Sequence, residues 1–314
     1  MRIVVPAGGI GAARFLRGLL SYASSAAMDA DVTVIGNTAD DISLFGLRVC
    51  PDLDTVMYTL GGGISEDQGW GRADETFVVK AELAAYEMEP QWFGLGDRDI
   101  ATHIVRTQML SAGYPLSAVT AALCARWQPG VEILPMTDDR VETHVVVDSD
   151  GGPKAIHFQE WWVRLRAEVP AQSIVQIGAD DAKPGPGVLE ALAAADVVLL
   201  PPSNPVVSIG AILSVPGIRS ALLSCSAPVV GVSPIIGGAP VRGMADACLA
   251  AIGVATSASA VAGLYEDFLD GWLVAPFDGF AHERIRVEER PLLMSSVSAT
   301  ADIAGAALAM AASL

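Results

Sequence analysis

Short apolar runs alternate with amphipathic segments at the start of the chain. The β-branched run 2–5 predicts a strand, the pattern at 12–20 predicts a helix, and the run 32–35 predicts a second strand that ends at Gly36 and Asn37. A strand, a glycine-containing turn, a helix and a further strand in this order make a βαβ unit.

The C-terminal half repeats this pattern. Apolar runs at 173–177, 197–200 and 228–232 predict strands, and the segments 188–195, 217–223 and 241–252 have helical patterns. Strands that are apolar at every position are typical of parallel sheets, which helices cover on both faces. The Ala-rich segment 299–314 predicts a packed terminal helix.

The middle of the chain has a different pattern. Residues 73–127 are helical in pattern, and Asp99 is the expected N-cap of a helix that begins near Ile100. Strands are predicted at 131–134, 143–147 and 154–158, and a turn at 148–153 joins the last two. We therefore predict a Rossmann-like α/β fold with a doubly wound, mostly parallel sheet. Residues 1–314 form a single domain, in which a helical and partly β insertion spans roughly 65–170.

Composition and charge narrow the possible functions. The net charge of −17 argues against binding to nucleic acid or to an anionic membrane, since both require a basic surface. The four cysteines have no paired spacing, which is typical of a reducing, cytoplasmic compartment. The apolar N-terminus is interrupted by glycines and arginines, so it predicts a strand and a helix instead of a signal peptide, and no segment has the pattern of a membrane span.

The glycine turn after the first strand predicts a phosphate site. Gly8, Gly9 and Gly11 allow a ligand to approach the backbone, and the following helix offers its free N–H groups, with Arg14 nearby. The same glycines are also compatible with a tight turn that binds nothing. A dinucleotide dehydrogenase would need glycine or alanine in place of Arg14 and an acidic residue in place of Asn37. No G-K-[ST] follows, so the turn is not a P-loop either.

Carboxylates gather after the second predicted strand, at the sheet edge where ligands bind in open parallel sheets. The cluster contains Asp40 and Asp41 in one segment and Asp52 and Asp54 in the next. Bound Mg²⁺ would neutralise a diphosphate that the acidic protein otherwise repels. The competing interpretation is that these residues only cap helices and form turns.

Two later segments fit a nucleotide crevice. Ser203 and Asn204 follow one predicted strand, and the segment 233–238, with Gly237, follows the next. Trp70 lies close to a run of three glycines and suits the cover of a planar ligand, although most tryptophans are core residues.

Taken in order, these motifs resemble the 2-phospho-L-lactate transferase family of coenzyme F420 biosynthesis. The resemblance rests on GGIGAAR, NTADD, CPDLDT, LGDRD, RWQPG, PMTDDR, HFQEWWVR, PPSNPVVSIG and SPIIGG, and it runs from residue 1 to about 295. The adjacent Trp161 and Trp162 and the Ala-rich style resemble the mycobacterial-type phosphoenolpyruvate transferase branch.

The resemblance implies an activity. The terminal hydroxyl of the deazaflavin Fo (7,8-didemethyl-8-hydroxy-5-deazariboflavin) attacks a guanosine diphosphate-type donor, lactyl- or enolpyruvyl-diphospho-5′-guanosine. GMP leaves, and coenzyme F420-0 or its dehydro form results. Mg²⁺ is required, and the family implies a homodimer.

The resemblance also implies roles for residues. Asp40 and Asp54 are the expected catalytic and metal-binding residues, with Asp41 or Asp52 as the alternative to one of them. The donor diphosphate is expected at the glycine turn and Arg14. The remaining assignments are Ser203, Asn204 and Gly237 for guanosine, and Asp54, Trp70 and Arg98 for Fo.

Two alternatives stay open at this point. A non-enzymatic nucleotide-sugar-binding regulator of the same fold would keep the glycine turn, whereas Asp40, Asp54 and the loop 95–99 favour a transferase. An NAD oxidoreductase is disfavoured by Arg14 and Asn37.

Overall fold

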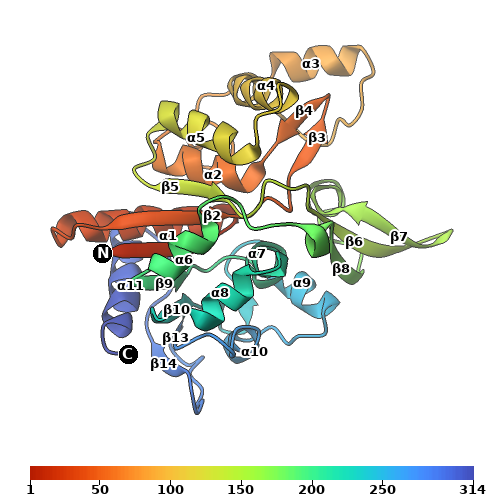
Figure 1. Ribbon diagram of the computed structural model, residues 1–314. Helices are drawn as coiled ribbons and strands as arrows, with labels where there is room; N and C mark the ends of the chain where they lie inside the picture. Colours follow the sequence, from red (N-terminus) through yellow and green to blue (C-terminus); the bar gives the residue numbers. More distant parts are fainter.

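A seven-stranded parallel sheet forms the centre of the computed structural model, which describes residues 1–314 (Figure 1). Its strand order is β14-β13-β10-β9-β1-β2-β5. The strands are β1 (Arg2–Ala7), β2 (Asp31–Gly36), β5 (Glu132–Pro135), β9 (Val197–Leu200), β10 (Val229–Val232), β13 (Gly271–Val274) and β14 (Arg286–Glu289). The predicted α/β fold with a parallel sheet is confirmed.

The strand order reverses between β1 and β9. β1 pairs with β2 on one side, in the register Ile3 to Val32, and with β9 on the other, in the register Ile3 to Val197. The chain therefore builds outward from β1 in one direction and from β9 in the opposite one. Loops that leave the carboxyl ends of these two neighbouring strands diverge, and the crevice between them is where open α/β sheets bind ligands.

Helices cover both faces of the sheet, which explains why its strands are apolar throughout. Ile3 and Val5 point into one core and Val4 into the other. The first core contains α1 (Gly9–Ser25), α2 (Pro51–Leu60), α5 (Leu116–Trp127) and α11 (Val297–Ala311). The second contains α6 (Val188–Ala194), α7 (Ala211–Ser214), α8 (Ile218–Ser224), α9 (Ala245–Ala251) and α10 (Ala258–Gly263), with the π-helix η3 (Pro205–Gly210).

The middle of the chain adds two groups of elements at one side of the sheet (Figure 1). The helices α3 (Val78–Ala85) and α4 (Asp97–Ser111) lie with the hairpin of β3 (Ile42–Leu44) and β4 (Leu47–Val49). A separate antiparallel sheet, in the order β7-β6-β8, extends away from the body. It contains β6 (Glu142–Ser149), β7 (Gly152–His157) and β8 (Ala171–Ile177), and β7 leads into the π-helix η1 (Glu160–Arg164).

Two predicted strands belong to the other sheet. The run 173–177 is part of β8 and pairs antiparallel with β6, so its assignment to the parallel sheet was wrong. Val175 and Ile177 are exposed in this strand, so its apolar residues do not mark a strand that is buried on both faces. The run 131–134 overlaps β5, which pairs parallel with β2 although it lies inside the predicted insertion.

Two predicted helix boundaries also differ. α4 begins at Asp97 after Gly96, so Asp99 lies in the first helical turn and is not the N-cap. Its carboxylate instead accepts a hydrogen bond from Tyr58 at 2.6 Å. The helix predicted at 241–252 is shorter, because β11 (Ile235–Ile236) and β12 (Ala239–Pro240) form a hairpin before it. The predicted terminal helix corresponds to α11, which packs along α1.

The short 3₁₀ helix η2 (Ala179–Asp181) completes the secondary structure. No single helix has both the length and the hydropathy to cross a membrane; one pair, Pro205–Ser214 with Ile218–Ser224, meets that test only together and is bent by 86°.

Candidate active site

A cavity of about 590 Å³ opens at the carboxyl edge of the parallel sheet, at the reversal between β1 and β9. Loops after β1, β2, β9 and β10 form its walls, together with the start of α2 and parts of the insertion. Its polar and aromatic lining residues include Arg14, Asp40, Asp52, Trp70, Phe93, Phe158, Gln159, Trp162, Ser203, Asn204, Ser208 and Arg242.

The glycine turn after β1 forms one wall. Gly9 begins α1 with a φ of +72°, a left-handed conformation that favours glycine. A Cβ on Gly8 would lie 2.6 Å from Asp52 Oδ2, and a Cβ on Gly11 would clash with the Pro202 carbonyl oxygen. Glycine therefore lets the turn pack directly against α2 and against the loop after β9. The N-cap residue Gly8 makes no side-chain cap and the first turn of α1 has no acidic residue, so its free N–H groups are available to an anion beside the Asp52 carboxylate, which interacts with the Gly9 backbone.

Asp40 and Asp52 bring two buried carboxylates to the same cavity. Asn37, which follows β2, holds Asp52: its Nδ2 donates to Asp52 Oδ2 at 2.8 Å and to the Val207 carbonyl oxygen at 3.2 Å. Asp40 Oδ1 is buried without any hydrogen-bond partner. Asn37 stands where a dinucleotide site would carry its ribose-binding acid, and here it positions a carboxylate instead.

Burial raises the pKa of both carboxyl groups. The pKa of Asp52 rises to about 6 because of burial, although hydrogen bonds from Asn37 and from the Gly9 backbone oppose the shift. Burial, followed by the charge of Asp52, raises the pKa of Asp40 well above 3.8. Two desolvated carboxylates that oppose each other's ionisation are stabilised by a bound cation.

This pair fits Mg²⁺. No three His, Cys, Asp or Glu side chains converge in a metal-binding group, so the protein offers two carboxylates and no complete ligand cage. Mg²⁺ is commonly held by one or two carboxylates, with phosphate oxygens and water completing its coordination. Asp40 Oδ1, which is buried without a hydrogen-bond partner, is the oxygen best suited to contact the cation.

Asp54, for which metal and Fo roles were predicted, lies on a different side of α2 from Asp52. It is not a lining residue of the cavity, because residues two apart on a helix point in different directions and Asp52 takes the cavity side of α2. Asp54 forms a buried ion pair with Arg106 of α4 and lies 3.8 Å from His103 Nδ1. Asp52, which the sequence left as an alternative, occupies the cavity position instead.

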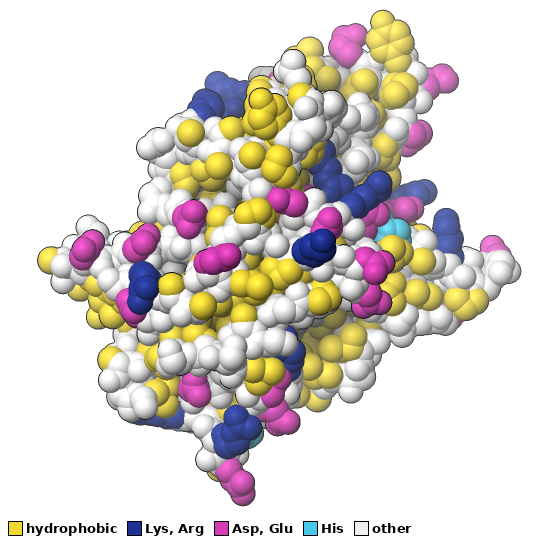
Figure 2. Space-filling model, in the orientation of Figure 1, with side chains coloured by type: hydrophobic (Ala, Val, Ile, Leu, Met, Phe, Trp, Pro, Cys, Tyr) yellow, Lys and Arg dark blue, Asp and Glu magenta, His cyan; other side chains and the backbone are white.

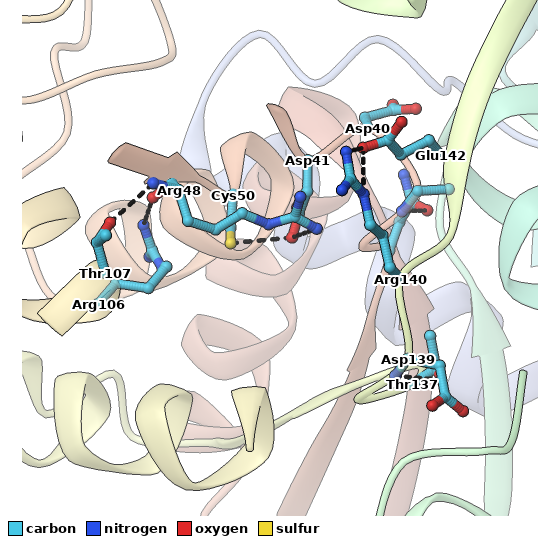
Figure 3. A network of polar contacts seen from close by, with 12 residues as sticks. Asp40, Asp41, Arg48, Cys50, Arg106, Thr107, Thr137, Asp139, Arg140 and Glu142 are labelled. Carbon is cyan, nitrogen blue, oxygen red and sulfur yellow. Dashed lines mark hydrogen bonds and ion pairs between the residues drawn. The ribbon is translucent and has the colours of Figure 1, made fainter. Parts of the chain in front are cut away.

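A buried polar network behind the cavity holds α2, α4 and the β3–β4 hairpin together (Figure 3). Cys50 Sγ donates to Asp41 Oδ2 at 3.0 Å, and Arg48 Nη2 lies 3.2 Å from the same oxygen. Burial raises the pKa of Asp41 to about 6 even though Arg48 lowers it. Arg106 Nη1 donates to the Arg48 carbonyl oxygen at 3.4 Å, which links this group to the ion pair of Asp54. Asp41 thus anchors the loop on which Asp40 faces the cavity.

The loop after β9 forms the opposite wall. Ser203 and Asn204 line the cavity, but both side chains also make bonds within the protein. Ser203 Oγ donates to the Gly8 carbonyl oxygen at 2.9 Å, and Asn204 Oδ1 accepts from two backbone N–H groups of η3 at 2.9 and 3.2 Å. Gly237 lies outside the lining, in the turn of the β11–β12 hairpin, where its N–H donates to Asp278 at 2.8 Å. The guanosine contact predicted for Gly237 stays a prediction.

Aromatic side chains form the wall that the insertion supplies. Trp70 is on the cavity wall, together with Phe158 and Trp162, whose ring centroids are 5.4 Å apart. Flat rings of this kind suit a planar ligand. Arg98, the other residue predicted for Fo, is not in the lining; it lies in the first turn of α4, and its backbone N–H donates to Glu75 at 2.8 Å.

Arg14 and Arg242 are the two cationic side chains of the cavity. Neither has a carboxylate within 4.0 Å. On the face of the molecule in Figure 2, basic side chains occur in small separate groups among acidic and apolar ones. The sequence pointed to Arg14 through the glycine turn, but nothing in the spacing around Arg242 marks it, since it reaches the cavity only through the β11–β12 hairpin.

The chain is similar to known proteins over nearly its whole length. Residues 3–296 match the family model described as 2-phospho-L-lactate transferase CofD. The chain is 68% identical over 317 residues to a protein of Streptomyces griseus named phosphoenolpyruvate transferase, with 99% of this chain and 98% of the relative covered. A protein of the same name from Mycolicibacterium smegmatis is 56% identical over 324 residues, with 99% of both chains covered.

A solved structure shows the same fold. The crystal structure of a UPF0052 family member from Bacillus halodurans superposes with a TM-score of 0.62 at 16% identity, covering 98% of this chain and 99% of that one. At this identity, the likeness concerns the fold alone.

Proposed function

The chain belongs to the 2-phospho-L-lactate transferase CofD family, and we propose that it transfers a phosphoenolpyruvyl group from a guanosine diphosphate-type donor to the terminal hydroxyl of Fo. It is therefore an enzyme, a transferase. The observation that carries the proposal is that the N-terminus of α1 and two buried carboxylates meet in one cavity. That combination suits a diphosphate with a divalent cation. The name shared by relatives at 56% to 68% identity supports enolpyruvate as the transferred acid in place of lactate.

The donor diphosphate binds at the glycine turn. Backbone N–H groups at the start of α1 donate to its oxygens, and the guanidinium of Arg14 adds positive charge. The guanosine extends toward the loop after β9, where Ser203 and Asn204 present mainly backbone groups, since their side chains are bonded internally. In a protein of net charge −17, these local donors have to overcome the repulsion of a polyanion.

Asp40 and Asp52 are the residues that would hold Mg²⁺. When bound, the ion supplies charge neutralisation for the leaving phosphate. Asn37 keeps Asp52 in place through its 2.8 Å hydrogen bond, and the network around Asp41 anchors the loop of Asp40. Asp54 acts at a distance from the substrates, by fixing α2 against Arg106.

Fo binds against the aromatic wall of the insertion, with its ring beside Trp70, Phe158 and Trp162. Its ribityl hydroxyl oxygen attacks the phosphorus that bears the enolpyruvyl group. The bond from this phosphorus to the bridging oxygen breaks, and GMP leaves with that oxygen. The hydroxyl proton passes to a carboxylate oxygen of the cavity that the cation leaves free.

Release of GMP from enolpyruvyl-diphospho-5′-guanosine tests this function against a pure binding role. We expect GMP to appear only when Fo and Mg²⁺ are both present, and in a one-to-one ratio to the phosphorylated Fo. A protein that bound the donor but never released GMP would be a binding module. Release at the same rate without Fo would make it a hydrolase.

A further inference from the structure

Arg242 reaches the cavity from the segment between β12 and α9 and lies beside the glycine turn. Its Nη2 donates to the carbonyl oxygen of Gln68, in the loop that follows α2. A Cβ on Gly69 would lie 3.1 Å from both Arg242 Nη1 and Ile10 Cγ2. Both the guanidinium and Ile10, which lies between Gly9 and Gly11, therefore lie close to Gly69, and a side chain at this position would crowd them.

The guanidinium of Arg242 forms no ion pair within the protein. A guanidinium has five N–H donors, and the bond to Gln68 uses one of them. Aspartate and glutamate outnumber lysine and arginine by 36 to 19, yet no carboxylate lies within 4.0 Å of this side chain. An unpaired arginine in the wall of an anion-binding cavity is suited to charge-assisted hydrogen bonds with phosphate or carboxylate oxygens.

The bond to Gln68 connects this arginine to the aromatic wall. Gln68 lies two residues before Trp70, and both residues are exposed, while Gly69 between them is buried and Glu66 of the same loop pairs with Arg17 of α1 at 2.9 Å. Backbone bonds from Gly69 to Ser65 and from Ser65 to Gly71 shape the loop internally, but they do not fix it to the opposite wall of the cavity. Arg242 spans from one wall to the other.

We propose that Arg242 binds an anionic oxygen of the donor and at the same time holds the Trp70 loop, so that donor binding orders the acceptor site. This inference rests on the proposed function. It makes Arg242 a specificity and positioning residue that the two substrates share, and it predicts that the affinity for Fo depends on the same side chain as the affinity for the donor. The anionic oxygen belongs either to the diphosphate or to the carboxylate of the three-carbon acid.

Steady-state kinetics of Arg242→Gln test the proposal. We expect the KM for enolpyruvyl-diphospho-5′-guanosine to rise about tenfold or more, the loss typical of one charge-assisted hydrogen bond. We expect the KM for Fo to rise about fivefold, as for one ordinary hydrogen bond that orders the loop. Arg242→Lys keeps the charge but loses the planar fork, so it should recover the donor KM more fully than the Fo KM. Arg286→Gln, which removes an equal charge from β14 outside the cavity, is the matched control and should change neither KM.

Calorimetry with GDP identifies the oxygen. A loss of GDP affinity in Arg242→Gln that matches the rise in donor KM assigns the contact to the diphosphate, and unchanged GDP affinity beside a raised donor KM assigns it to the carboxylate. Unchanged KM values for both substrates, or a change in only one of them, would overturn the bridging role. If the wild-type protein bound no GDP, the proposed function itself would fail, and that result is separate from any effect of Arg242.

Discussion

Replacement of Asp52 by asparagine should make the metal-free protein more stable and nearly inactive. Asp52 is buried at the cavity wall, with its Oδ2 2.8 Å from Asn37 Nδ2. The side-chain oxygen of an asparagine at this position keeps that hydrogen bond, since Nδ2 of Asn37 is the donor. The substitution therefore removes a buried charge while leaving the local packing in place.

The size of the effect follows from the pKa of Asp52, which burial raises from 3.8 to about 6 in the folded protein. The folded state then binds the proton more tightly than the unfolded state, so the stability of the metal-free wild type falls as the pH rises from about 4 to about 6. At 1.36 kcal/mol per pKa unit, ionisation of this group lowers the free energy of unfolding by about 3 kcal/mol at pH 7. At pH 4 the difference shrinks to below about 1 kcal/mol.

Urea denaturation of the metal-free proteins at pH 7 and pH 4 measures this difference. Asp52→Asn should gain about 3 kcal/mol over wild type at pH 7 and little at pH 4, while its turnover falls by orders of magnitude. Asp196→Asn is a control of opposite sign: Arg2 lowers the pKa of Asp196 to about 2, so this exposed variant should lose a little stability at pH 7. A loss of stability in Asp52→Asn at pH 7, or a gain that did not depend on pH, would refute the reasoning.

Three further predictions concern the glycine turn, the ion pair of Asp54 with Arg106, and the salt dependence of donor association. In Gly11→Ala the new methyl group meets the Pro202 carbonyl oxygen, so GDP affinity measured by calorimetry should fall about tenfold; a folded variant with unchanged affinity would place the nucleotide elsewhere. Arg106→Met leaves Asp54 buried without its partner and should lower the free energy of unfolding by about 3–5 kcal/mol in urea, whereas the exposed Arg164→Gln should change it by less than about 0.5 kcal/mol; equal effects would contradict the network's role. With Mg²⁺ saturating, the association rate of the donor in stopped-flow should hardly change between low and moderate salt, because a local cationic site acts within a Debye length of about 8 Å; a steep fall would reveal a broad basic surface.

The sequence predicted the sheet and the glycine turn because local chemistry determines both. Strands such as 197–200 are buried on both faces, so every position is apolar and the pattern is clear. The left-handed backbone at position 9 and the close packing at positions 8 and 11 require glycine, so the residue types alone indicate the turn. The prediction for 173–177 was wrong because β8 is an edge strand of the antiparallel sheet with partly exposed apolar residues. Over five residues, its pattern cannot be distinguished from that of a buried parallel strand.

The site was predicted less completely, since it depends on which way each side chain points. Asp52 and Asp54 lie two residues apart, and only the rotation of α2 decides that Asp52 faces the cavity and Asp54 faces Arg106. No local pattern indicated that Arg106, which is 52 residues from Asp54 in the sequence, would be buried beside it. Arg242 reaches the cavity through a tertiary contact with Gln68, which no local pattern encodes. The predicted homodimer and cytoplasmic location stay predictions.

Mass spectrometry of the products formed from Fo with each donor tests the central claim most directly. Reactions would contain Mg²⁺ and either enolpyruvyl- or lactyl-diphospho-5′-guanosine, with GMP quantified in the same samples. We predict that the enolpyruvyl donor gives dehydro-coenzyme F420-0 and an equal amount of GMP, and that Asp40→Asn and Asp52→Asn give neither. A product formed only from the lactyl donor would contradict the assignment of the transferred acid, and the absence of any phosphodiester of Fo from both donors would contradict the proposed function.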